Sequence, residues 1–133
     1  LRELATKEQS RRAALVLDKA RSLDKKKDYL DAWRQCRDAE SYTLAAKEAA
    51  DAKAFREAME KDAKRGPDLK KDADKELKPS NKKAESKIKS KKWDDAIAIL
   101  EPLIAQFPDC PEKDAAKKML EDAKAAKAGA KGP

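Results

Sequence analysis

The stretch KKWDDAIAILEPLIAQFPDCPE, residues 91–112, is the most regularly patterned part of the chain and decides the fold that we expect. Its apolar residues recur at intervals of one and three, which is the spacing of one helix face: Trp93, Ala96, Ile97, Leu100, Leu103, Ile104 and Phe107. Pro108 should end this helix, and Pro111 suits the first position of a following helix. The stretch therefore predicts two helices joined by a short turn.

The remainder of the chain also predicts helices. Neither glycine nor proline occurs before Gly66, and alanine, lysine, glutamate, aspartate and leucine dominate the composition. Only 5% of the residues are aromatic, so the core must be thin and built from closely approaching helices. We expect one all-α domain over residues 1–126 and a disordered tail over residues 127–133. Residues 29–65 are predicted to be helical, either as one long helix or as a hairpin.

A lysine-rich segment lies in the middle of the chain. Residues 61–92 contain thirteen Lys or Arg against six Asp or Glu, and the resulting charge of +7 equals that of the whole chain. Large apolar residues are scarce in this segment, and its RGP and KPSN sequences are typical of helix ends. We predict a solvated connector within the domain, with a short helix over residues 68–78. Gly66 is expected to end the helix before it.

The chain resembles itself at an offset of 64 residues, which places residues 18–33 on residues 82–97. Both segments have a small residue in one helix, an aromatic residue opening the next, and an alanine three positions later. The matched pairs are Ala20 with Ala84, Tyr29 with Trp93, and Ala32 with Ala96; four residues further, Cys36 meets Leu100. Small residues at these positions would let paired helices approach closely. The pattern therefore predicts a helical repeat.

This pattern resembles the tetratricopeptide repeat, a helix–turn–helix unit of about thirty-four residues. The resemblance rests on the four matched pairs and on Pro108, which ends the second helix. It implies antiparallel helical hairpins arranged as an α-solenoid, with a closing C-terminal helix. Because 64 is near twice the repeat length, a degenerate unit should lie between the two copies, with candidates Tyr42, Ala45, Ala46, Phe55 and Ala58.

The resemblance implies a non-catalytic scaffold or adaptor that binds a peptide or partner protein in a groove between the first helices of each pair. Lys19, Lys83 and Lys87 fall on those helices, so the expected ligand is an acidic peptide or a carboxylate terminus. Two alternatives stay open. The chain could bind nucleic acid or an acidic polymer through residues 61–92, although that segment holds one arginine and no aromatic residue. It could also be an accessory helical tail of a larger enzyme.

The residues that most enzymes and metal sites need are missing. The chain has no histidine and no glycine-rich phosphate loop, so we expect neither catalysis nor a cofactor. Asp72, Asp74 and Glu76 begin like a calcium loop, but Leu77 and Lys83 occupy the positions of its glycine and its bidentate glutamate. No metal site is expected. Cys36 and Cys110 are interpreted as two isolated thiols in preference to a disulfide.

The compartment is only weakly indicated. No apolar run is long enough to span a membrane. The sequence QFPDCPEKDAAKKML is similar to the corresponding part of repeats in bacterial envelope proteins, which favours an exported protein over a cytoplasmic one. The chain starts at Leu1 without a signal-like stretch, so we expect either that a leader was removed or that this is a piece of a longer protein. Nothing in the sequence indicates an oligomeric state.

Overall fold

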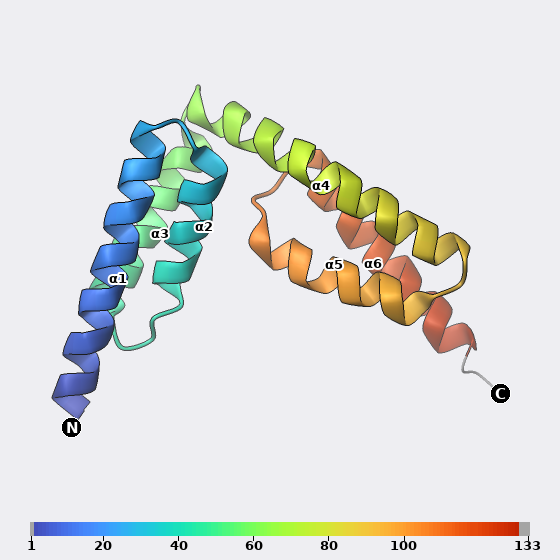
Figure 1. The fold of residues 1–133 in the computed structure, drawn as a ribbon, viewed down its shortest axis with the longest axis horizontal. Coiled ribbons are helices and arrows are strands. Elements are labelled where there is room, and N and C mark those ends of the chain that lie inside the picture. The colour runs from blue at the N-terminus through green and yellow to red at the C-terminus, as the bar shows by residue number, and fades with distance from the viewer. Residues whose placement is uncertain (1, 131–133) are drawn as a thin grey trace. The chain divides into compact units, whose positions relative to one another are not determined.

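The computed structural model describes residues 2–130, which form six α-helices and no strand (Figure 1). The helices are α1 (Arg2–Lys25), α2 (Tyr29–Glu40), α3 (Ala46–Lys61), α4 (Arg65–Lys89), α5 (Trp93–Gln106) and α6 (Pro111–Ala130). The expected all-α fold is confirmed. Where the sequence predicts one domain, the chain divides into two compact units, residues 1–69 and 70–133.

In the first unit, α1, α2 and α3 pack against one another. The core of this unit consists of small and medium-sized side chains, with Val16 and Phe55 half-buried against it: Leu17, Ala20, Cys36, Ala39 and Ala52. Residues 29–61 thus form two helices joined by a short loop, which decides between the long helix and the hairpin. The backbone amide of Leu44 in that loop donates to the side chain of Gln9 on α1 at 2.9 Å, which ties the loop to α1.

In the second unit, one small residue from α4, one leucine from α5 and one small residue from α6 meet in a core. These buried residues are Ala84, Leu100 and Ala116. Half-buried apolar side chains of α5 and α6 surround them: Ile99, Ile104, Met119 and Leu120. Because two of the three central residues are alanines, the helix backbones can approach closely, as the composition predicted.

The two cores are related by the 64-residue offset. Ala20 and Ala84, Cys36 and Leu100, and Ala52 and Ala116 are equivalent pairs, and each residue is at most 1% exposed. The third pair lies on α3 and α6, outside the segments that the sequence comparison matched. The repeating unit is therefore a set of three helices. Phe55 is half-buried against the first core, whereas Ala58, expected at a packing position, is exposed.

The turns between the first and second helix of each unit have the same geometry. Lys27 and Lys91 have φ angles of 63° and 59°, and the residue after each has φ −92° and ψ close to 70°. In both turns a backbone amide reaches back five residues, from Asp28 to Leu23 and from Lys92 to Lys87, at 2.9 Å. This is the hydrogen-bond pattern of a Schellman cap, with lysine at the left-handed position that glycine usually occupies. The offset of 64 is thus preserved in the backbone.

The structure differs from the sequence prediction along the lysine-rich segment. Residues 65–89 form one continuous helix that passes through Pro79, so the predicted helix end at residue 78 is wrong. The predicted solvated connector is wrong as well, because one side of α4 is at most 1% exposed: Leu69, Ala73, Leu77 and Ala84. Pro79 removes one backbone donor from α4, and burial on either side of it keeps the helix continuous.

Gly66 does not end a helix but lies in the first turn of α4, so that prediction is also wrong; α3 already ends at Lys61. A Cβ atom on Gly66 would lie 2.6 Å from the backbone oxygen of Glu60, which explains the glycine by close approach. Asp62 starts the new helix, because its carboxylate accepts the amides of Lys64 and Arg65 at 2.9 and 2.8 Å. These hydrogen bonds lower the pKa of Asp62.

The end of the chain follows the prediction in part. α5 ends at Gln106, Phe107 is its extended C-cap and Pro108 follows directly, while α6 begins at Pro111 as expected. The helix continues to Ala130, so residues 127–130 are helical where a disordered tail was predicted. The rest of the predicted tail, residues 131–133, lies outside the described residues.

Candidate interaction surface

Five lysines form a row along the exposed side of α4: Lys71, Lys75, Lys78, Lys82 and Lys89. At 100° per residue, they fall within a sector about 60° wide, and the row is roughly 27 Å long. All five side chains are exposed, while the opposite side of the helix is buried. We call these five residues the lysine row. All five charges of the row are positive and lie on the same exposed side of α4.

Few acids neutralise the lysine row. Lys89 pairs with Glu85 at 3.3 Å. Within the described residues, none of the other four lysines has an ion pair. Asp72 and Glu76 project from α4 at least about 90° away from the centre of the row, whereas Asp68, Asp74 and Glu85 lie about 50–70° from it. The lysine row is therefore a surface of mainly positive charge, in which four of the five lysines have no ion pair within the described residues.

The equivalent positions of α1 provide an internal comparison. Subtracting 64 from the lysine row gives Lys7, Arg11, Ala14, Asp18 and Lys25. Two of these residues already have partners, because Arg11 pairs with Glu8 at 2.8 Å and Asp18 pairs with Arg21 at 3.5 Å. The α1 face carries three cations and one acid and the α4 face carries five cations, although the two faces share one backbone architecture. The uniform charge is thus a property of this sequence and not of the repeat.

The three lysines predicted to bind a partner do not belong to the lysine row. Lys83 is exposed and Lys87 is half-buried, one turn apart on a different side of α4. Lys19 is exposed on α1 in the first unit. Lys83 and Lys87 are thus brought together on one helix, and a groove that includes Lys19 stays a prediction. Sequence reasoning missed the lysine row because the segment was interpreted as a connector, although its spacing of four, three and four is helical.

The predicted repeat positions are mostly packing residues. Ala20, Ala32, Ala84, Ala96 and Leu100 are fully buried, Tyr29 is 6% exposed, and Pro108 is buried. Trp93, the partner of Tyr29 in the repeat, is half-buried. None of the six aromatic residues, all of which lie in the described part, is exposed. Aromatic platforms for stacking bases are therefore not presented on the surface.

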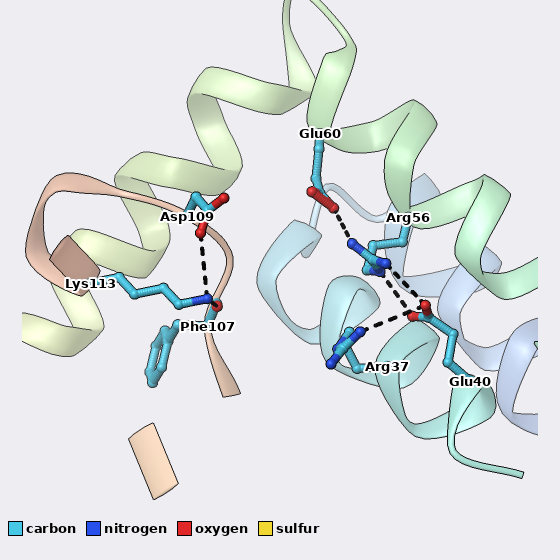
Figure 2. A network of polar contacts seen from close by, with 7 residues as sticks. All are labelled: Arg37, Glu40, Arg56, Glu60, Phe107, Asp109 and Lys113. Carbon is cyan, nitrogen blue, oxygen red and sulfur yellow. Dashed lines mark hydrogen bonds and ion pairs between the residues drawn. The ribbon is translucent and has the colours of Figure 1, made fainter. Parts of the chain in front are cut away.

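A charged network connects α2 to α3 in the first unit (Figure 2). Arg56 donates two hydrogen bonds to the carboxylate of Glu40, at 2.9 and 3.0 Å, and a third to Glu60 at 2.6 Å. The side chains of Arg56 and Glu40 are only 14% and 13% exposed. Arg37 adds a longer ion pair to Glu40 at 3.7 Å. The hydrogen bonds from Glu40 raise the pKa of Arg56 above its ordinary value, so the guanidinium stays charged, and the network is a structural clamp.

A second polar cluster fixes the start of α6. Asp74 on α4 accepts the backbone amide of Glu112 at 2.9 Å, and the Asn81 side chain donates to the backbone and side-chain oxygens of Glu112 at 2.8 and 2.9 Å. Lys113 donates to the backbone oxygen of Phe107 at 2.7 Å and lies 3.6 Å from Asp109 (Figure 2). Asp74, one of the calcium-loop candidates, is thus used to cap a helix. Within the described residues, no group of histidine, cysteine or acidic side chains is arranged to hold a metal ion.

Cys36 and Cys110 are free, buried thiols. Burial raises the pKa of Cys36 to about 12 and that of Cys110 to about 11. Both thiols therefore stay protonated near neutral pH, and neither has the lowered pKa of a reactive cysteine. The interpretation of two isolated thiols agrees with this arrangement.

The raised pKa of Cys36 predicts a loss of stability in alkali. Its ordinary value is 9.0, so above pH 9 the unfolded chain releases this proton while the folded chain keeps it up to a pH of about 12. The free energy of unfolding should therefore fall by up to about 1.4 kcal/mol per pH unit from this thiol. Urea unfolding of the protein and of a Cys36→Ala variant between pH 8 and pH 11 measures this. Equal pH slopes for the two proteins would contradict it.

None of the described helices is long and apolar enough to cross a membrane. No protein-family model matches the sequence, and no curated protein or solved structure matches it either.

Proposed function

We propose that this protein is a non-catalytic interaction module, a scaffold or adaptor, that binds an acidic partner protein through the lysine row of α4. The single observation that carries the proposal is the row itself: five exposed lysines on one side of a helix whose other side is buried. Unpaired surface charge of one sign attracts and orients a partner of the opposite sign. The equivalent face of α1, with its internal ion pairs, lacks this property.

The geometry favours an acidic helix or peptide over nucleic acid. The first four lysines are spaced by four, three and four residues, which is also the spacing of carboxylates along one face of a second helix. Proteins that bind single strands combine basic grooves with exposed aromatic side chains, and here every aromatic residue is buried or half-buried. The row contains no arginine, which is the side chain that most often makes bidentate hydrogen bonds to guanine and to phosphate groups.

The test is affinity capture from a nuclease-treated lysate of the cells that make the protein. Three baits are compared: the full chain, a row variant with Lys71, Lys75, Lys78 and Lys82 changed to Gln, and a control variant with Lys47, Lys53, Lys117 and Lys118 changed to Gln. The control loses the same charge from exposed positions outside the row. Four exposed ion pairs at roughly 0.4 kcal/mol each predict about a tenfold loss of affinity for the row variant.

The expected result is an acidic protein that the full chain and the control variant retain and that the row variant loses. If the row variant captures as much of the acidic protein as the full chain does, the lysine row of α4 is not the binding surface. Recovery of nucleic acid in place of a protein when nuclease is omitted would favour the alternative of a nucleic-acid-binding module. Circular dichroism of all three baits checks that the substitutions leave the helices intact.

A further inference from the structure

Positive charge is unevenly distributed along α4 and the turn that follows it. Residues 70–80, which we call the first stretch, contain four lysines and three acids, a net charge of +1. Residues 82–92, the second stretch, contain six lysines and one acid, a net charge of +5. The two stretches are equally long, and Asn81 separates them. The end of the lysine row near the turn to α5 is therefore much more positive than its beginning.

The single acid of the second stretch neutralises only part of it. Glu85 pairs with Lys89 at 3.3 Å. At 100° per residue, Glu85 lies about 160° around the helix from Lys83 and from Lys87, which places it on the other side of α4. Neither of these two lysines has an ion pair in the part of the chain that the structure describes. Most of the charge of the second stretch is thus open to a partner.

Other features of the second stretch also favour a bound carboxylate. Lys91 and Lys92 are exposed in the turn after α4, so the positive surface continues past the end of the helix. Ser86 is exposed as well, and it lies one turn from Lys82 and from Lys89. Its hydroxyl can donate a hydrogen bond to a carboxylate that those lysines attract. The dipole of α4 adds about half a negative charge at this end, which is small against a net charge of +5.

The two stretches are far enough apart to attract a partner separately. Their centres, Lys75 and Lys87, are roughly 18 Å apart along α4. The Debye length is about 8 Å at physiological ionic strength. A carboxylate bound at one stretch therefore gains little from the charge of the other. The direction in which an elongated partner lies along α4 decides how strongly its acidic end is held.

We propose that the acidic partner binds along α4 in one orientation, with its most acidic end at the second stretch. This inference rests on the function proposed above and adds the polarity of the contact. The partner that fits is a helical segment whose carboxylates are concentrated toward one end. At roughly a twofold gain in affinity for each exposed ion pair, four glutamates favour this orientation by about tenfold over the opposite one.

A spin-label experiment on the full, isotope-labelled chain measures the orientation. The probe is a helical peptide of about eighteen residues, the length of the lysine row, with four glutamates in one half and neutral residues in the other. A nitroxide is attached to either end, and the broadening of backbone amide signals is recorded at about 150 mM salt. The label at the acidic end should broaden residues 82–92, and the label at the neutral end should broaden residues 70–80. A peptide of reversed sequence should give the same result.

Two variants test whether the charge of the second stretch sets the orientation. Lys83→Gln, Lys91→Gln and Lys92→Gln together leave the lysine row intact and lower the charge of the second stretch to +2. The preference between the two orientations should fall from about tenfold to about twofold. A control variant should keep the tenfold preference, because it loses the same charge from exposed positions outside α4: Lys47→Gln, Lys53→Gln and Lys117→Gln.

Three results would overturn the inference while the lysine row remained the binding surface. The first is equal broadening of both stretches by either label. The second is a pattern that follows the chain direction of the peptide and not its acidic end. The third is an unchanged preference in the variant of the second stretch. If neither peptide perturbs the signals of α4 at all, the proposed function fails together with the inference.

Discussion

The variant Arg56→Ala is expected to lower the free energy of unfolding by about 3 kcal/mol, which is the lower end of the effect of breaking a buried ion pair. The guanidinium holds Glu40 with two hydrogen bonds and Glu60 with a third. With the arginine removed, the carboxylate of Glu40 would stay in a site where its side chain is 13% exposed, with little water to replace the lost donors. Urea denaturation at neutral pH, followed by circular dichroism, measures the change.

Two control variants separate the buried charge from the loss of side-chain contacts. The double variant Glu40→Gln with Arg56→Met removes both charges, so it should be less destabilising than Arg56→Ala alone. Arg37→Ala removes an ion pair of 3.7 Å from a side chain that is 48% exposed, and it should cost less than about 1 kcal/mol. If Arg56→Ala were no more destabilising than Arg37→Ala, the clamp between α2 and α3 would be insignificant.

Leu100→Ala is expected to destabilise the second unit by about 3 kcal/mol, which is within the range measured when a buried leucine is replaced by alanine and a cavity is left. Leu100 is fully buried, and it is the one large side chain between Ala84 and Ala116. Its neighbours at the centre are alanines, which cannot extend to fill the space that the leucine leaves. Chemical denaturation that monitors Trp93 fluorescence measures the loss.

Leu103→Ala is the matched control for this prediction, because Leu103 lies on the same helix and is only half-buried. The same three side-chain carbon atoms are removed there from a less buried site, so the loss of stability should be about half as large or less. Equal losses for the two variants would mean that the three-residue core does not dominate the stability of the second unit.

Much of the fold could be predicted from single residues. The apolar face of α5 and the prolines around it predicted that helix and the start of α6, because these residues act through local geometry. The 64-residue offset correctly paired Ala20 with Ala84 and Cys36 with Leu100, which are equivalent core positions. It also aligned Lys27 with Lys91, whose turns have the same dihedral angles and hydrogen bonds.

The course of α4 could not be predicted in this way. Pro79 and the high lysine content both indicated a break in the helix. The buried side of α4 was also hard to recognise in the sequence, because Ala73 and Ala84 are only weakly hydrophobic. Packing decided the outcome, since Leu69 and Leu77 are each 1% exposed on either side of Ala73. A solvated connector has no helix face, so interpreting the segment as one concealed that its lysines lie on one side of a helix. The candidate surface therefore depends on a helix that only the structure reveals.

The most direct test of the central claim is an NMR titration of the full, isotope-labelled chain with a synthetic peptide that carries glutamates at the spacing of the lysine row. At about 150 mM salt, where distant charges are screened, we predict that the largest shift changes occur along the exposed side of α4, from Lys71 to Lys89, and that the row variant loses them. Saturable changes that avoid α4, or tighter binding of a single-stranded oligonucleotide of equal charge, would contradict the proposed acidic protein partner.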